Sequence, residues 1–205
     1  MDGIKNIIFD LGGVIINLDN KRTEDAFRAL GAKDFGNHFG HGFAASFFKD
    51  YEMGKISDAQ FIQNLREMGG LEDPDKTLVD AWNALLLDFP PERIRLLENL
   101  RKDYRIFLFS NTNALHLEAL QAIYRQTIPS GDLDALFEKA YYSHLMGMRK
   151  PDVEAFRLIL RENKLVPGET LFIDDARVNV DGANSAGLRG FFLEPGKSIT
   201  DIDWS

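Results

Sequence analysis

The chain has 205 residues, 44% hydrophobic and 27% charged, the balance of a soluble globular protein rather than of a linker or a peptide. Its formal net charge of −8 argues against binding to nucleic acid or to an anionic membrane, because both require a basic surface. Without cysteine it forms neither disulfides nor thiolate-ligated metal sites. No apolar run approaches the ~18 residues of a membrane span, so we expect a cytoplasmic protein.

Short apolar runs predict strands that are buried on both faces of a parallel sheet. In chain order they are residues 4–9, 106–109, the weaker 140–143, 170–173 and 188–193. The later runs are separated by segments with helical character, such as residues 153–163, where apolar side chains recur on one face. This alternation predicts an α/β fold with a doubly wound, Rossmann-like parallel sheet.

The first two predicted strands are separated by about 95 residues, whereas a strand–helix–strand crossover needs roughly 30. The stretch has no convincing strand pattern, and helices are predicted at residues 21–30, 58–68, 76–87 and 91–103. Ser57 opens the second helix with a capping box, and Pro91 suits the first turn of the last. We predict a helical cap domain at residues 19–88, inserted into a catalytic core of residues 1–18 and 89–205.

Polar side chains follow three of the predicted strands and the loop between two of them. They are Asp10 with Gly12 and Gly13, then Ser110, Asn111, Thr112 and Asn113, then Lys150, and finally Asp174 and Asp175. In open α/β sheets ligands bind beyond the carboxyl ends of the strands, so we expect these side chains to meet in one crevice. The two glycines would let a ligand approach the backbone closely.

Carboxylates that crowd together repel one another unless a cation lies among them, and all-oxygen ligation suits Mg²⁺. The metal would neutralise an anionic substrate while Asp10 attacks in line and forms an acyl-phosphate. Ser110 or Thr112 would hold phosphoryl oxygens, with Asn111 contributing through its backbone as well as its side chain. Lys150 would balance the charge that develops. The residues therefore predict a Mg²⁺-dependent hydrolase of small phosphate monoesters.

These motifs resemble those of the haloacid dehalogenase superfamily of aspartyl-nucleophile hydrolases. The matching segments are residues 9–14, 110–112, 150–151 and 172–175, and the helical insertion resembles the small cap of one large branch. The resemblance covers nearly the whole chain. It implies that Asp10 is the nucleophile and a Mg²⁺ ligand, and that the carbonyl of Gly12 is a second ligand. It also implies that Asp175 ligates directly, that Asp174 ligates or holds a metal-bound water, and that Asn179 gives polar support.

Position 12 departs from the family pattern. Phosphatases of the family usually carry a second aspartate there as general acid and base, a role worth ~10² to 10⁴ in rate, whereas this chain has Gly12. The first motif and the strings at residues 110–113 and 147–151 are similar to a branch that hydrolyses α-D-glucose 1-phosphate and related sugar phosphates without this aspartate. An anomeric hydroxyl leaves more easily than an ordinary alcohol, so the resemblance implies sugar phosphates as substrates.

Three other functions share parts of the pattern. A 2-haloacid dehalogenase usually has an aromatic residue and a threonine where this chain has Gly12 and Val14. A signalling receiver domain carries its acidic pair on the first strand, whereas Asp174 and Asp175 follow a late strand here. A phospho-ligand-binding protein that keeps the metal and the cap but has little catalytic activity stays open. The sequence also leaves open whether the chain forms a homodimer.

The predicted cap carries aromatic and histidine side chains that either line a substrate pocket or form a helical core. They are Phe35, His38, Phe39, His41, Phe43, Phe47 and Phe48. A spacing near four residues favours the core for the phenylalanines. Residues 51–57 resemble a cap segment that begins near the active site, through which Glu52 could reach substrate. His116 faces either the entrance or the solvent, and the sequence does not decide between them.

Overall fold

A five-stranded parallel sheet forms the centre of the computed structural model, which describes residues 1–32, 46–128 and 131–204. The strands are β1 (Asn6–Phe9), β2 (Arg105–Ser110), β3 (Lys139–Tyr142), β4 (Thr170–Asp174) and β5 (Arg189–Phe192). Their order in the sheet is β3-β2-β1-β4-β5, so the winding reverses at the central strand β1. The predicted doubly wound α/β fold is confirmed.

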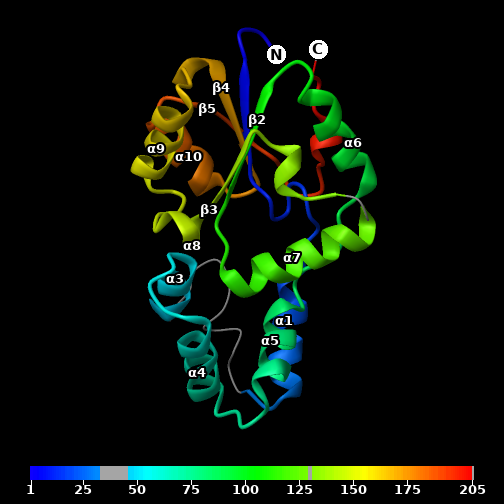
Figure 1. Cartoon of the computed structure of the whole chain (residues 1–205), viewed down its shortest axis with the longest axis vertical. Coiled ribbons are helices and arrows are strands. Elements are labelled where there is room, and N and C mark those ends of the chain that lie inside the picture. The colour runs from blue at the N-terminus through cyan, green and yellow to red at the C-terminus, as the bar shows by residue number, and fades with distance from the viewer. Residues whose placement is uncertain (33–45, 129–130, 205) are drawn as a thin grey trace.

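Helices cover both faces of the sheet (Figure 1). They are α6 (Pro91–Leu100), α7 (Ala114–Thr127), α8 (Ser143–Met146), α9 (Val153–Asn163) and α10 (Arg177–Ser185), with short 3₁₀ turns η1 (Asp134–Leu136), η2 (Pro167–Glu169) and η3 (Ile199–Asp201). Successive side chains of a strand point to opposite faces, and β1 shows the result. Ile7 and Phe9 join the cluster with α6 and α7, whereas Ile8 joins the cluster with α9 and α10. Burial on both faces explains why residues 7–9 are all apolar.

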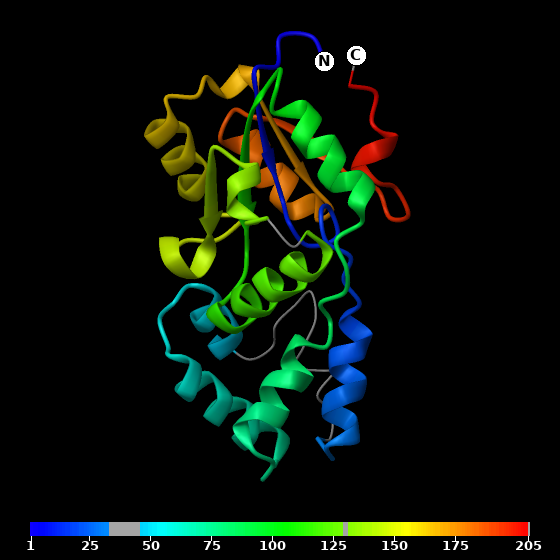
Figure 2. The ribbon, with the colours of Figure 1, turned by 45° about the vertical axis from the view of Figure 1, so that its right-hand side comes forward.

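The segment between β1 and α6 is mainly helical and lies beyond one end of the sheet (Figures 1 and 2). It contains α1 (Asn20–Ala29), α3 (Ser46–Glu52), α4 (Asp58–Gly69) and α5 (Asp75–Asn83). These helices have an aromatic core of their own, in which the rings of Phe48 and Phe61 lie 5.9 Å apart and those of Phe61 and Trp82 4.9 Å apart. Phe47 packs against this core and Phe48 is part of it, as the helical spacing favours. The other residues of that set, Phe35, His38, Phe39, His41 and Phe43, lie outside the described residues.

The two chain segments that join this unit to the core run side by side in opposite directions. The N–H of Asn17 donates to the carbonyl of Asp88 (3.0 Å), and the N–H of Leu87 donates to the carbonyl of Asn17 (3.1 Å). Leu18 and Leu86 form an antiparallel bridge between these segments. This pairing explains why α5 ends at Asn83 instead of continuing to the predicted residue 87. The domain boundaries at residues 18 and 89 stay predictions.

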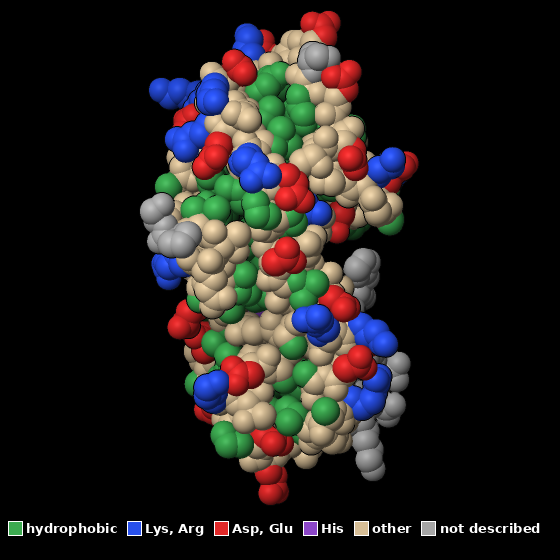
Figure 3. Space-filling model, turned by 90° about the vertical axis from the view of Figure 1, so that its right-hand side faces the viewer, with side chains coloured by type: hydrophobic (Ala, Val, Ile, Leu, Met, Phe, Trp, Pro, Cys, Tyr) green, Lys and Arg blue, Asp and Glu red, His purple; other side chains and the backbone are tan. Residues whose placement is uncertain are grey.

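In the described ranges, no helix combines the length and the apolar character that a membrane crossing needs. On the face shown in Figure 3, acidic and basic side chains are interspersed, and basic side chains do not gather into one patch. That distribution agrees with the acidic net charge of the chain.

Helix α7 lies across the junction between the sheet and the inserted helices (Figures 1 and 2). Residue His116 of this helix contacts α5. Its ring stacks on Trp82 of α5 with centroids 4.7 Å apart and an interplanar angle of 9°. Nε2 lies 3.2 Å from the carbonyl oxygen of Trp82, and Nδ1 lies 3.1 Å from Nδ2 of Asn113. A carbonyl only accepts, so Nε2 carries the proton and Nδ1 accepts from Asn113. His116 is thus a neutral link between the two parts of the chain.

This link makes the stability of the protein depend on pH. Burial lowers the pKa of His116 to about 4, and the hydrogen bond to Trp82 opposes the shift only in part. Because the folded pKa lies below the unfolded value near 6.5, the contribution is complete above pH 6.5 and is lost as the pH falls towards 4. We expect the free energy of unfolding to fall by roughly 2 kcal/mol through this group, a value reduced for the partial exposure of the residue. Urea unfolding at pH 7 and pH 4.5 measures the change. His116→Gln should show a smaller fall, and an equal fall in both proteins would contradict the assignment.

Candidate active site

The acidic residues predicted to meet do meet, at the carboxyl ends of β1 and β4. Asp10 follows β1, Asp174 ends β4 and Asp175 comes next in the chain. Each offers a carboxylate oxygen, and these three oxygens lie within 4.8 Å of one another. Two regions of sequence separated by most of the chain therefore present one concentrated negative charge.

Gly13 allows this approach. Its φ of 72° lies in the left-handed region, and an added Cβ would lie 2.2 Å from Oδ2 of Asp175. Any other side chain at position 13 would be strained and would also push Asp175 away from Asp10. The second glycine of the first motif is therefore required by the contact between the two acidic motifs.

Lys150 supplies the positive charge of the site. Its side chain is 1% exposed, and its Nζ donates to Oδ1 of Asp10 (2.6 Å) and to Oδ2 of Asp174 (2.7 Å). The ring centroids of Phe109 and Phe172 lie 5.5 Å and 5.4 Å from Nζ, within range for cation–π attraction. Burial alone would lower the pKa of Lys150, but the two carboxylates outweigh burial and raise this pKa. The ammonium group therefore stays charged.

The loop after β2 fixes the backbone around Lys150. Asn111 donates from Nδ2 to the carbonyl of Lys150 (3.0 Å) and accepts at Oδ1 from its N–H (2.9 Å). Thr112 is held by Ser143, whose hydroxyl accepts from the N–H of Thr112 and donates to its carbonyl, both at 2.9 Å. Ser110 is buried at the end of β2. The side chain of Asn111, predicted to contact substrate, is thus used to orient Lys150.

Asp174 and Asp175 differ in their surroundings. The carboxylate of Asp174 is fully buried and accepts from Lys150, from the N–H of Ala176 (2.8 Å) and from Nδ2 of Asn179 (3.0 and 3.1 Å). Asp175 is exposed. Because protein donors already occupy both oxygens of Asp174, Asp10 and Asp175 are better placed to give oxygens to a cation. Asn179 gives the polar support that the family resemblance implies.

The electrostatics of Asp10 test whether the site fits a divalent cation. Burial raises the pKa of Asp10 to about 7; the charge of Lys150 opposes the shift, and the charges of Asp174 and Asp175 reinforce it. One lysine thus leaves the three carboxylates under-compensated. A hard cation with oxygen ligands would favour the charged form of Asp10, and the donor set of carboxylates suits Mg²⁺.

At position 12 the space that a side chain would need is partly filled. A Cβ added to Gly12 would lie 2.6 Å from Cδ1 of Leu18, which belongs to the first of the two joining segments. An aspartate there would therefore have to displace Leu18. The absence of the usual second aspartate agrees with this local packing.

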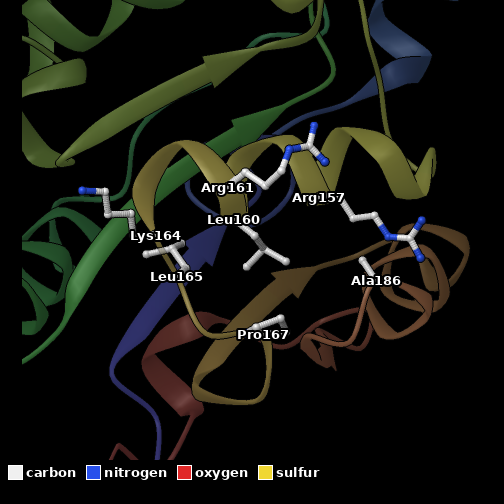
Figure 4. A pocket seen from close by; sticks show the side chains of 7 residues that line it. All are labelled: Arg157, Leu160, Arg161, Lys164, Leu165, Pro167 and Ala186. Atoms are coloured by element: carbon white, nitrogen blue, oxygen red, sulfur yellow. The ribbon is translucent and has the colours of Figure 1, made fainter.

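One hollow among the described residues lies away from the acidic cluster. It measures about 480 Å³ and is lined by Arg157, Leu160, Arg161, Lys164, Leu165, Pro167 and Ala186 (Figure 4). Leu165 and Pro167 precede β4, so this hollow lies towards the amino end of that strand. The acidic cluster is at the opposite, carboxyl end, where open α/β sheets bind their ligands. The hollow therefore does not mark the active site.

Comparison with known proteins places the chain in a family. Residues 4–187 match the model of the haloacid dehalogenase-like hydrolases. The chain belongs to this family. The match spans most of the chain, both acidic motifs and the helical insertion. The predicted family and the predicted hydrolase class are confirmed.

Relatives within this family match nearly end to end. The D-ribitol-5-phosphate phosphatase of Bacteroides thetaiotaomicron is 30% identical over 202 residues, covering 98% of this chain and 95% of the relative. A magnesium complex of a HAD-family enzyme from the same organism is 35% identical, with a TM-score of 0.88 over 100% of this chain and 98% of the other. The same enzyme with magnesium and inorganic phosphate has a TM-score of 0.86, again at 35% identity, over 98% of each chain.

Three contacts of the site could not be predicted from sequence motifs. Ser143 holds Thr112 although it stands in none of the four motifs, and the sequence placed it only at the end of a weak strand. Leu18 occupies the space beside Gly12 because two joining segments pair, and no local pattern signals that pairing. The double hydrogen bond of Asn111 also depends on tertiary contact.

We expect Lys150 to be a large contributor to stability. Lys150→Met leaves Asp10 and Asp174 buried without their cation, and breaking such a pair costs about 3 kcal/mol or more. The matched control is Lys76→Met, which removes an exposed pair with Asp80 of the same 2.6 Å length and should cost under ~0.5 kcal/mol. Urea unfolding at pH 8 measures both. Mg²⁺ should stabilise Lys150→Met more than it stabilises the parent, and equal losses in the two variants would contradict the role of Lys150.

Proposed function

We propose that this chain is a Mg²⁺-dependent phosphatase that hydrolyses sugar or polyol phosphates through an aspartyl-phosphate on Asp10. The observation that carries the proposal is the buried contact of Asp10 with Lys150, beside Asp174 and Asp175. It combines a candidate nucleophile, a fixed cation beside it and a set of oxygen ligands for a metal, which would favour the charged form of Asp10. Support comes from the D-ribitol-5-phosphate phosphatase and from the related enzyme that was crystallised with magnesium and inorganic phosphate.

In the proposed reaction, a carboxylate oxygen of Asp10 attacks phosphorus and forms a new O–P bond. The bond from phosphorus to the ester oxygen of the substrate breaks, and the leaving oxygen takes a proton from solvent water as the alcohol is released. Water then attacks the acyl-phosphate, which releases inorganic phosphate and restores Asp10. Lys150 balances negative charge on the phosphoryl oxygens and is held in place by Asn111.

A magnesium ion, when bound, would offset the negative charge of the phosphoryl group. Asp10 and Asp175 would hold it with the carbonyl of Gly12, and Asp174 would lie beside them. Ser110 and Thr112, with Gly12 and Gly13 of the first loop, would surround the phosphoryl oxygens. These assignments rest on the position of each residue at the carboxyl ends of β1, β2 and β4.

Two candidate substrates differ in how easily their leaving group departs. The ester in α-D-glucose 1-phosphate has an anomeric leaving group, which fits the missing aspartate at position 12. D-Ribitol 5-phosphate, named for the relative, is the ester of an ordinary terminal alcohol and needs more help from an acid. We favour the polyol or sugar phosphate class that includes both. The dehalogenase alternative lacks its aromatic residue and threonine at positions 12 and 14.

Phosphate release tests the proposal. With Mg²⁺ present, we expect hydrolysis of at least one of D-ribitol 5-phosphate, α-D-glucose 1-phosphate and p-nitrophenyl phosphate. Asp10→Asn should lose at least about 10³-fold in rate, since it removes the nucleophile. The control Asp181→Asn, on the exposed side of α10, should keep parental activity. Turnover that survives in Asp10→Asn would refute the covalent route, and a parent that binds these esters without releasing phosphate would favour the binding-protein alternative.

The affinity for Mg²⁺ should depend on pH. Because the pKa of Asp10 is raised to about 7 in the metal-free site, a proton competes with the cation below that pH. We expect the apparent affinity to change little from pH 9 to 8 and to fall by up to about tenfold per pH unit below 7. Calorimetric titration with MgCl₂ at pH 8 and 6 measures this. Asp175→Asn should bind more weakly at both values, whereas an affinity that does not change with pH would exclude Asp10 as a ligand.

A further inference from the structure

Glu52 and Arg149 form an ion pair between the inserted helices and the core. Glu52 is the last residue of α3, and Arg149 directly precedes Lys150. Nη2 of Arg149 lies 2.8 Å from Oε2 of Glu52, and the side chains are only 22% and 14% exposed. The pair therefore lies one residue from the catalytic lysine, on the side of the core that faces the inserted helices.

The pair is poorly satisfied. Its 2.8 Å contact is not aligned as a hydrogen bond, and Nε of Arg149 is buried with no hydrogen-bond partner among the described residues. Nδ1 of His144 is likewise buried with no hydrogen-bond partner among the described residues. Buried polar groups are almost always hydrogen bonded, and each one left unpaired costs roughly 1–3 kcal/mol. Three such groups on neighbouring segments call for a partner that the described residues do not provide.

The three groups lie at one place in the fold. Gly54, two residues after Glu52, has a φ of 66°, and a Cβ there would lie 2.2 Å from the carbonyl oxygen of His144. The turn after α3 is thus packed directly against α8. Ser143, the neighbour of His144, holds Thr112 of the loop after β2. The unpaired groups therefore adjoin the loops that carry Thr112 and Lys150.

The ion pair of Arg157 and Glu154 differs from that of Arg149 and Glu52 in both alignment and burial. Nη1 of Arg157 donates to Oε1 of Glu154 at 2.7 Å, and both side chains are about half exposed. That pair is aligned and solvated, as a surface ion pair normally is. The pair of Glu52 and Arg149 has nearly the same length but is buried and misaligned, which argues against a purely structural role.

We infer that Glu52 and Arg149, with His144 beside them, bind hydroxyl groups of the substrate's sugar or polyol part and so determine specificity. The inference rests on the proposed function and names the residues that recognise the leaving group. A hydroxyl both donates and accepts, so one hydroxyl can donate to the carboxylate of Glu52 and accept from Nε–H of Arg149. Such a group supplies the missing partners without adding charge. Because these atoms are closed off from solvent here, the substrate enters while the inserted helices stand away from the core and is enclosed when they close.

The test measures ligand binding instead of turnover. A failure of the inference can therefore be distinguished from a failure of the proposed function. In the Asp10→Asn protein with Mg²⁺, calorimetry gives the dissociation constants of D-ribitol 5-phosphate and of inorganic phosphate. We expect the ester to bind at least tenfold more tightly than phosphate. Glu52→Leu and Arg149→Met should each remove most of this preference while the phosphate constant stays within about twofold. Glu52→Gln, which keeps an accepting oxygen, should retain part of it. The matched control is Arg157→Met, which should leave the preference unchanged.

Thermal unfolding first confirms that each variant is folded. A preference that survives in both Glu52→Leu and Arg149→Met overturns the inference. An equal loss of affinity for the ester and for phosphate also overturns the inference, because it indicates that the substitution has displaced Lys150. If Asp10→Asn shows no preference for the ester, the inference is wrong even when the parent hydrolyses p-nitrophenyl phosphate. If the preference is present and depends on the pair, but the parent releases no phosphate, the proposed function fails and the inference stands.

Discussion

The ammonium group of Lys150, enclosed between Asp10 and Asp174, is the interaction on which the site depends. Three carboxylate oxygens within 4.8 Å of one another would otherwise repel strongly in a buried place. Lys150 compensates part of this charge, and Phe109 and Phe172 hold the ammonium in an apolar setting where its attraction to carboxylates is large. The remaining negative charge would favour a bound cation at this place.

The fold supplies the positions that this interaction needs. The central strand β1 brings Asp10 between β2 and β4, so the motifs after all three strands face one another. A side chain at position 13 would push Asp175 away from Asp10, and Gly13 has none. Asn111 ties the Lys150 backbone to the loop after β2, so the distance between Lys150 and Asp10 is set by the sheet and its adjoining loops.

Much of this could be predicted from the sequence because the relevant signals are local. A strand buried on both faces gives a continuous apolar run, and all five strands lie within two residues of the predicted bounds at each end. Polar residues directly after such runs identify the edge of the sheet where Asp10, Lys150 and Asp174 meet. The early end of α5, the position of Leu18 beside Gly12 and the pairing of Glu52 with Arg149 could not be predicted in this way. Each depends on contacts between segments far apart in the chain, for which a single sequence contains no periodic signal.

The paired segments at Leu18 and Leu86 have a consequence for how such enzymes diversify. The inserted helices leave and rejoin the core at adjacent points, so they can lengthen, shrink or be exchanged without altering the order of the strands. Their separate aromatic core lets them accumulate changes of their own. Evolution can therefore retarget the enzyme to a new ester while the phosphate chemistry is inherited intact.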